Sequence, residues 1–307
     1  MSVIGIDTSN YTTSIAFFNG IDGENCSKLL PVKQGELGLR QSDAVFAHTK
    51  SLPELSGRLF SHVRKDSITA VGVSTRPRAV EGSYMPCFMV GYSHAKLLSD
   101  VLNVPLVEVS HQQGHVAASL WSADRLDLMD QPHLAWHLSG GTTELLLVEP
   151  EGKNVICTKI GGTTDISAGQ LIDRTGQLLQ LPFPSGKHLD VLSAEATLKE
   201  TFKVKCTNME FSLSGVQNKV QQFHAAHEEA AETAGYALRC VAKAVFLATE
   251  QALKAYPGLP VVFSGGVASN SLLRQVIAPL NPIFAQPQYS TDNAMGVAVL
   301  AHRITEA

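Results

Sequence analysis

Two apolar runs open the chain: Val3-Ile4-Gly5-Ile6-Asp7-Thr8-Ser9 and Thr12-Thr13-Ser14-Ile15-Ala16-Phe17-Phe18. Apolar and β-branched residues on both sides of a short polar turn predict a hairpin of two strands. The pattern recurs further on, where Leu134–Leu138 and Glu144–Val148 flank the turn Ser139-Gly140-Gly141-Thr142-Thr143. Two parts of one chain that begin in the same way indicate a duplicated architecture, with the second unit beginning near Pro132.

The composition of the chain is typical of a globular protein. The chain has 307 residues, 44% of them hydrophobic and 17% charged, which is ordinary for a globular protein with room for two domains. A formal charge of −4 predicts no autonomous binding to nucleic acid, so an RNA partner would need a local basic patch or a helper protein. Five cysteines without paired spacing argue against a disulfide framework and favour a reducing cytoplasm. The N-terminus has no basic leader, and no apolar run approaches the ~18 residues of a membrane span, so neither export nor a membrane anchor is expected.

Two histidines stand four residues apart in His111-Gln112-Gln113-Gly114-His115, after the predicted strand Val104–Val109. On a helix this spacing places both imidazoles on one face, where they can share a metal ion. The spacing alone is weak evidence, because His133 and His137 have it too. That second pair lies in an apolar run that leads into a glycine turn, which predicts a strand and no shared metal.

Glycine pairs follow two predicted strands. Ser139-Gly140-Gly141 follows one, and Ser264-Gly265-Gly266 follows the buried run Val261-Val262-Phe263 and precedes a predicted helix that contains Asn270. Without a Cβ, the backbone can approach a phosphate closely, and open α/β sheets bind nucleotides where strands end. Glycine pairs also serve as plain hairpin turns. The acidic turn at Asp7 also has two interpretations, a site for a phosphate or a metal-bound phosphate and a plain turn.

Three further helices are predicted, over 165–181, 228–256 and 293–304. The first contains Asp173 and stops before Pro182, whereas the second has an apolar stripe that marks it as core. Asp292 precedes the last helix, where an aspartate often serves only as an N-cap.

In this order the motifs resemble those of the threonylcarbamoyladenosine tRNA-modifying synthase family, TsaD or Gcp, once described as O-sialoglycoprotein endopeptidases. The resemblance runs nearly end to end and includes Phe211-Ser212-Leu213-Ser214-Gly215. It implies an α/β, actin-like (ASKHA) fold with two similar lobes and a nucleotide and metal cleft between them. Residues 1–131 would form the first lobe, with residues 291–307 packing back on it, and residues 132–290 the second, nucleotide-binding lobe.

The resemblance also implies which residues form the site. One divalent metal, iron or zinc, would be held by His111, His115 and Asp292. An adenine nucleotide (ATP, AMP or threonylcarbamoyl-AMP) would be contacted by Ser139, Gly140, Gly141, Thr142, Asp173, Gly186, Asp190, Gly265, Gly266 and Asn270. Asp7 and Ser9 are the candidate catalytic residues of the first turn.

The activity implied is transfer of a threonylcarbamoyl group from threonylcarbamoyl-AMP to the adenosine beside the anticodon of tRNA. The partners implied are tRNA and helper proteins, TsaB-like and TsaE-like, and a dimer with a second copy or a paralogue is compatible with the family. Two imidazoles and one carboxylate leave coordination positions open on the metal, which suits a Lewis acid that binds a phosphate or polarises a carbonyl. This set of ligands does not distinguish iron from zinc.

The chain departs from the family at four places. Asn10-Tyr11-Thr12 replaces an acidic Cys-Asp-Glu turn, Gln113 replaces a Glu, and Thr142 replaces a His. Arg76-Pro77-Arg78-Ala79-Val80-Glu81-Gly82 replaces a Gly-Pro-Gly-Leu loop. Three interpretations therefore stay open: the transferase, a non-catalytic nucleotide-binding paralogue that acts as a regulatory or assembly partner, and an actin-fold ATPase or kinase. A His-Glu-x-x-His metalloprotease is disfavoured, because Gln112 stands where the general base would be.

Overall fold

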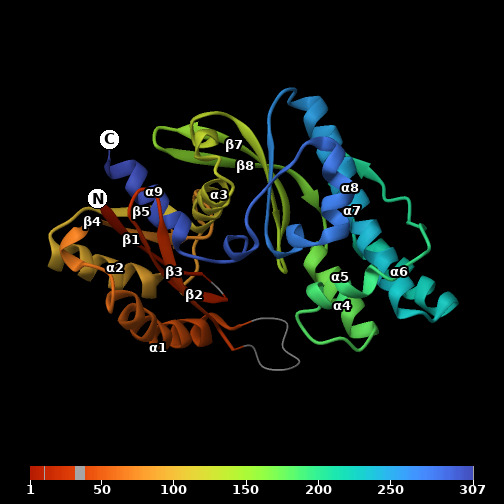
Figure 1. The fold of residues 1–307 in the computed structure, drawn as a ribbon, viewed down its shortest axis with the longest axis horizontal. Helices are drawn as coiled ribbons and strands as arrows, with labels where there is room; N and C mark the ends of the chain where they lie inside the picture. Colours follow the sequence, from red (N-terminus) through yellow and green to blue (C-terminus); the bar gives the residue numbers. More distant parts are fainter. Residues whose placement is uncertain (10, 32–38, 307) are drawn as a thin grey trace. The chain divides into compact units, whose positions relative to one another are not determined.

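The chain divides into two structural units (Figure 1). A computed structural model describes residues 1–9, 11–31 and 39–306. Unit 1 comprises Met1–Gln131, Glu149–Cys157 and Asp292–Ala307, and unit 2 comprises Pro132–Val148 and Thr158–Thr291. In the part of the chain that is described, no helix has both the length and the apolar character needed to cross a bilayer.

A five-stranded mixed sheet is the centre of unit 1, in the order β3-β2-β1-β4-β5. Its strands are β1 (Ser2–Thr8), β2 (Thr12–Phe18), β3 (Gly23–Leu29), β4 (Ile68–Arg76) and β5 (Leu106–Ser110). The predicted hairpin is confirmed, because β1 and β2 pair antiparallel with Asp7 opposite Ser14. Strands β1, β4 and β5 run parallel, so their carboxyl ends share one edge.

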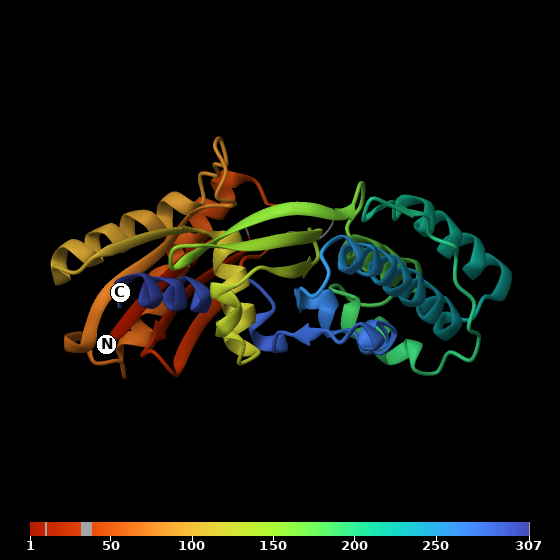
Figure 2. The same ribbon diagram turned by 90° about the horizontal axis from the view of Figure 1, so that it is seen from above.

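Helices cover both faces of this sheet (Figure 2). They are α1 (Gln41–Phe60), α2 (Phe88–Leu102), α3 (His111–Ser122) and α9 (Met295–Thr305). Thr8 faces α2, where its hydroxyl accepts a hydrogen bond from the Gly91 N–H. The neighbouring positions of β1 face the opposite way. Gly5 lies against Ala298 of α9 and Ala294, the residue before this helix, so closely that no Cβ would fit. Asp7 follows this alternation toward the α9 face.

Most of a seven-stranded sheet, in the order β12-β11-β6-β7-β8-β10-β9, belongs to unit 2, whereas residues 149–157 of β7, β8 and their turn belong to unit 1. The strands of this sheet are β6 (His133–Leu138), β7 (Thr143–Glu151), β8 (Asn154–Thr163), β9 (Cys206–Thr207), β10 (Glu210–Phe211), β11 (Val261–Ser264) and β12 (Ile283–Phe284). The predicted hairpin over the Gly-Gly turn is confirmed, because β6 and β7 pair antiparallel. His133 and His137 lie on a strand, as predicted.

The helices of unit 2 are α4 (Ala168–Leu178), α5 (Gly186–Ser193), α6 (Ser214–His227), α7 (Ala230–Ala255) and α8 (Ser271–Ile277). Short 3-10 turns occupy Lys65–Ser67, Leu126–Asp130, Gly266–Ser269, Ala278–Leu280 and Pro287–Tyr289. The apolar stripe of α7 is core, as predicted, and Trp136 donates its indole N–H to Thr249 of this helix at 2.8 Å.

Several predicted boundaries are wrong. The helix expected over 228–256 spans Ala230–Ala255, and the strand expected over Val104–Val109 spans Leu106–Ser110. The helix expected over 165–181 begins only at Ala168, because Ser167 caps it in a reciprocal pair with Gln170. Asn270 does not lie within a helix but is the N-cap of α8, accepting from the Leu273 N–H. The last helix begins at Met295, two residues later than predicted.

Candidate functional site

Helix α3 carries the predicted pair of metal-binding histidines. Ser110 and Gln113 cap it reciprocally, so the helix begins at His111 and places His115 one turn further on. The two rings meet edge to face with centroids 4.3 Å apart. Their Nε2 atoms are 2.9 Å apart. Both nitrogens therefore face one point.

Asp292 lies at the same point. Its Oδ1 is 3.1 Å from His115 Nε2 and 3.6 Å from His111 Nε2. The interpretation of Asp292 as a helix cap is wrong, because Ala294 is the N-cap of α9 and makes no side-chain capping bond. Among the described residues, His111, His115 and Asp292 form the one group of side chains found with the spacing to hold a metal ion.

Two glycines allow this convergence. A Cβ built on Gly296 of α9 would lie 1.8 Å from the carbonyl oxygen of Gly114 in α3. Gly114 stands between the two histidines, and Gly296 follows Asp292 by one helical turn. The backbones of α3 and α9 therefore approach closely at the level of the three side chains.

Asp7, near the end of β1, contacts the ring nitrogen of His111 that points away from His115. Its Oδ2 accepts from His111 Nδ1 at 2.6 Å, and its Oδ1 accepts from the Ser9 N–H at 2.8 Å. The carboxylate is 1% exposed. A carboxylate on the far nitrogen of a ligating imidazole fixes the tautomer and leaves the near nitrogen for the metal. Ser9, the other candidate catalytic residue, has a buried Oγ with no partner among the described residues.

The electrostatics and spacing fit a cation. Burial alone would lower the pKa of His111, but the carboxylates of Asp7 and Asp292 outweigh it and raise that pKa to about 10. Burial would raise the pKa of Asp292, but hydrogen bonds to both histidines hold it well below its ordinary value. A cation about 2.0–2.1 Å from each donor keeps the donors about 3.0 Å apart at right angles and about 3.4 Å apart in a tetrahedron. The separations of 2.9 and 3.1 Å are close to the first value, and the separation of 3.6 Å is slightly longer than the second.

Gln113 explains one departure from the family. Its Oε1 accepts from the Ser110 N–H at 2.8 Å, and its Nε2 donates to the carbonyl of Val155 at 2.7 Å. A glutamate could accept the first bond but could not donate the second. In this chain the amide therefore joins the start of α3 to β8, where residues 154–157 belong to unit 1.

In unit 2, the turn between β6 and β7 has the features of a phosphate loop. The Ser139 N–H donates to the Thr142 carbonyl at 2.8 Å, and the Thr142 N–H donates to Ser139 Oγ at 3.0 Å. Ser167 donates its hydroxyl to the Gly140 carbonyl at 2.6 Å. Among the described residues, the N–H groups of Gly140 and Gly141 have no hydrogen-bond partner, and a Cβ on either would meet open space. Exposed consecutive amides suit an anion.

The other predicted nucleotide residues of unit 2 lie in two connected pairs. Asp173 accepts from the Ser185 N–H at 2.8 Å beside Gly186, the first residue of α5. Burial raises the pKa of Asp173, and this hydrogen bond opposes the shift. Asp190 accepts from Asn270 Nδ2 at 2.7 Å. The carboxylate of Asp190 therefore orients the amide that caps α8.

The two glycines after β11, Gly265 and Gly266, differ in the space around them. Gly265 has φ +93° and ψ 157°, and a Cβ there would lie 2.1 Å from the Leu138 carbonyl oxygen. A Cβ on Gly266 would meet nothing within 4 Å. The fold itself requires Gly265 to be glycine, whereas Gly266 leaves space beside the turn.

We expect the substitutions Gly265→Ala and Gly266→Ala to separate folding from ligand binding. Gly265→Ala should destabilise unit 2 by roughly 2–4 kcal/mol, because backbone strain of about 1–3 kcal/mol adds to a clash. Gly266→Ala should keep the wild-type unfolding curve but weaken AMP binding by about 10-fold, measured by calorimetric titration, if the space receives the nucleotide. Equal AMP affinity in Gly266→Ala and wild type would remove Gly266 from the site.

Sequence reasoning missed three serines that support these residues: Ser167, Ser185 and Ser271. Ser271 donates its hydroxyl to Asp190 at 2.7 Å. Only Ser167 had a recognisable signal, the Ser-x-x-Gln capping box. The turn Asn10-Tyr11-Thr12 differs from the acidic turn of the family, and its first residue, Asn10, lies outside the described residues.

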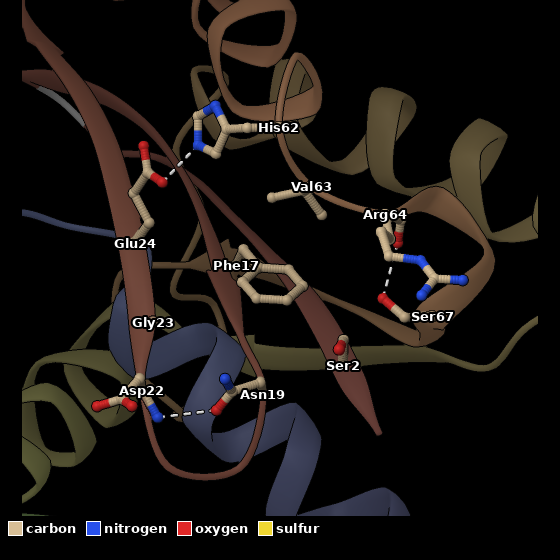
Figure 3. Close-up of a pocket in the computed structure, with 10 residues that line it drawn as sticks. All are labelled: Ser2, Phe17, Asn19, Asp22, Gly23, Glu24, His62, Val63, Arg64 and Ser67. Atoms are coloured by element: carbon tan, nitrogen blue, oxygen red, sulfur yellow. Dashed lines mark hydrogen bonds and ion pairs between the residues drawn. The ribbon is translucent and has the colours of Figure 1, made fainter.

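A separate groove of about 440 Å³ lies in unit 1 (Figure 3). Its lining includes Ser2 at the start of β1, Phe17 and the ion pair of Glu24 with His62. None of the predicted site residues lines it. Asp7 stands at the other end of β1, so this groove is distinct from the cluster of His111, His115 and Asp292.

The fold defines the class first: the chain has the actin-like fold. It superposes on full-length HypF in a phosphate- and nucleotide-bound form with a TM-score of 0.64 at 14% identity, over 100% of this chain and 47% of that one. It superposes on (R)-2-hydroxyglutaryl-CoA dehydratase component A of Acidaminococcus fermentans with a TM-score of 0.59 at 14% identity, over 100% of both chains. The ROK hexokinase of Thermus thermophilus gives 0.54 at 14% identity, over 100% of this chain and 99% of that one.

The chain belongs to the TsaD family, whose sequence profile, described as tRNA N6-adenosine threonylcarbamoyltransferase, matches residues 35–299. A relative of that name from Carboxydothermus hydrogenoformans is 31% identical over 98% of this chain and 91% of its own length. One from Streptococcus suis is 32% identical over 72% of this chain and 65% of its own. The family inferred from the motifs is confirmed.

Proposed function

We propose that this protein transfers a threonylcarbamoyl group from threonylcarbamoyl-AMP to the N6 amine of the adenosine beside the anticodon of tRNA. A bond forms between that nitrogen and the carbamoyl carbon, the bond from this carbon to the phosphate oxygen breaks, and AMP and a proton leave. The observation that carries the proposal is the convergence of His111, His115 and Asp292 in a member of the TsaD family.

His111, His115 and Asp292 would hold one iron or zinc ion. Bound there, the metal supplies a Lewis acid for a phosphate or a carbonyl oxygen. We assign Asp7 a positioning role: both its oxygens are engaged, one by His111 and one by the Ser9 N–H, so it orients the imidazole.

Unit 2 would bind the adenine nucleotide. The free amides of Gly140 and Gly141, beside Ser139 and Thr142, suit the phosphate. Asp173, Gly186, Asp190 and Asn270 would meet the ribose and the base, with Gly265 and Gly266 leaving room beside them. Because hydrogen bonds within the protein already orient Asp173, Asp190 and Asn270, they would contribute by positioning.

The negative net charge favours tRNA delivery with helper proteins, for which TsaB-like and TsaE-like proteins are the candidates. Pairing with a second copy or a paralogue is a further candidate assembly. The expected compartment is the cytoplasm.

A reconstituted transfer assay tests the proposal. Purified protein, unmodified tRNA, fresh threonylcarbamoyl-AMP and the candidate helpers are incubated, and the nucleosides are read by mass spectrometry. We expect threonylcarbamoyladenosine above a helpers-only control, and its loss with His115→Ala. No product from protein that binds metal and nucleotide would reject the transferase in favour of the non-catalytic paralogue.

A further inference from the structure

Arg76, the last residue of β4, and the connection to α2, residues 77–87, are together named here the β4–α2 loop. It carries two arginines, Arg76 and Arg78, and one acidic residue, Glu81, in a chain whose net charge is −4. Both arginines are exposed, and Tyr84 is 64% exposed. Exposed guanidinium groups and an exposed aromatic ring are thus concentrated in one short segment that the predicted site does not use.

The loop begins beside the helix that carries the histidines. Arg76 pairs in register with Ser110, the residue before His111. The Gln112 N–H, in the first turn of α3, donates to the Pro77 carbonyl at 3.0 Å. Because β4 and β5 are parallel neighbours, Arg76 and Ser110 stand at the same edge of the sheet, with backbones about 4.8 Å apart. An arginine side chain is longer than this spacing between the strands, so Arg76 is close enough to reach the start of α3.

Internal hydrogen bonds give the loop a defined shape. The Arg78 N–H donates to Ser83 Oγ at 3.0 Å, and the Ser83 N–H donates to the Val80 carbonyl at 3.2 Å. Gly82, with φ +74°, allows the reversal between them. Arg78 on one arm therefore stands opposite Ser83, the neighbour of Tyr84, on the other.

We propose that the β4–α2 loop is a contact site for single-stranded RNA, the anticodon loop of the tRNA substrate. The inference rests on the proposed function. Arg76 and Arg78 bind backbone phosphates, and the ring of Tyr84 stacks on an unpaired base. Unpaired RNA presents both partners at once, a phosphate and a free aromatic face, and such loops are recognised in this way by aromatic and arginine side chains. The loop also supplies the local positive charge that the whole chain lacks.

The test is fluorescence anisotropy of a labelled anticodon stem-loop with the full-length protein across a salt series. Arg76→Ala should weaken binding and reduce the slope of log affinity against log salt by about 1. Tyr84→Ala should weaken binding by roughly 5-fold or more without changing the slope, and Tyr84→Phe should retain the wild-type affinity. With tRNA in the transfer assay, both alanine variants should raise KM more than they lower kcat.

Matched controls lie elsewhere on unit 1: Arg64→Ala, an exposed arginine, and Phe46→Ala, a ring that is 65% exposed. Neither should change RNA affinity, and all variants should keep wild-type metal content and AMP affinity. If the variants of Arg76 and Tyr84 bind the stem-loop as wild type does, or if Tyr84→Ala equally weakens a fully duplex RNA, the loop contact is wrong. If RNA binds as expected but no threonylcarbamoyladenosine forms, the proposed function fails and the contact stands.

Discussion

Replacing Asp292 by alanine is expected to leave the protein without stoichiometric metal, and His111→Ala should do the same. Each substitution removes one of three donors whose mutual separations are 2.9 to 3.6 Å. In Asp292→Ala the loss is also electrostatic, because that carboxylate is the negative charge among the three donors. Asp7→Asn should act more mildly, weakening metal affinity by roughly 10- to 100-fold, because it disturbs the orientation of His111 and not the donor set.

Metal content after purification, by plasma mass spectrometry, and competition with a chelator give the two readouts. Asp22→Ala is the matched control, since Asp22 is an exposed carboxylate of unit 1 outside the cluster. Its metal content should equal that of wild type. One metal per chain in Asp292→Ala would reject the assigned ligand set, and wild-type affinity in Asp7→Asn would reject the positioning role.

Replacing Gly296 by alanine should destabilise unit 1. The new methyl group would stand 1.8 Å from the Gly114 carbonyl oxygen and 2.7 Å from the Ala118 N atom. Both are backbone atoms of α3, so the helices must move apart. Overpacking of this kind typically costs about 1–3 kcal/mol, and this backbone-to-backbone contact belongs at the upper end of that range. Because α3 carries the histidines and α9 follows Asp292, metal affinity should fall as well.

Denaturant unfolding followed by tryptophan fluorescence measures the loss of stability, and metal titration measures the loss of affinity. Gly57→Ala is the control, because Gly57 lies in helix α1 and a Cβ there would meet nothing within 4 Å. It should stabilise the protein by roughly 0.5–1 kcal/mol, as alanine for glycine does in a helix interior. A Gly296→Ala protein with wild-type stability and metal affinity would contradict the close helix contact as the cause of the convergence.

Local patterns in the sequence were enough for much of the secondary structure. The hairpin of β1 and β2, the hairpin around the Gly-Gly turn and the apolar helix α7, expected over 228–256, were all predicted, because each is a periodic run bounded by turn residues. The same reasoning separated the two histidine pairs correctly, since His111 and His115 lie on a helix and His133 and His137 on a strand. Helix ends were less predictable, because capping by Ser167 and Asn270 competes with the apolar pattern.

The roles of the site residues stay predictions, but the positions of these residues show which contacts could not be predicted from the sequence. Spacing indicated that His111 and His115 share a helix face, and the resemblance added Asp292. Nothing local indicated that Asp7 would hold His111 from 104 positions away, or that Asp292 would reach His115 across 177. In unit 2, Asp190 has the partners Asn270 and Ser271, which are 80 and 81 positions away in the sequence.

The sequence by itself determined the family, the alternation of strands and helices, and the residue types available for a metal and a nucleotide. These depend on interactions within a few residues or on motifs that can be compared directly. Only the tertiary structure decided that Asp7 supports the imidazole, that Gln113 must donate to Val155, and that Gly114 and Gly296 set the distance between α3 and α9. Those outcomes depend on the packing of segments far apart in the chain, where a single missing Cβ decides how closely two backbones approach.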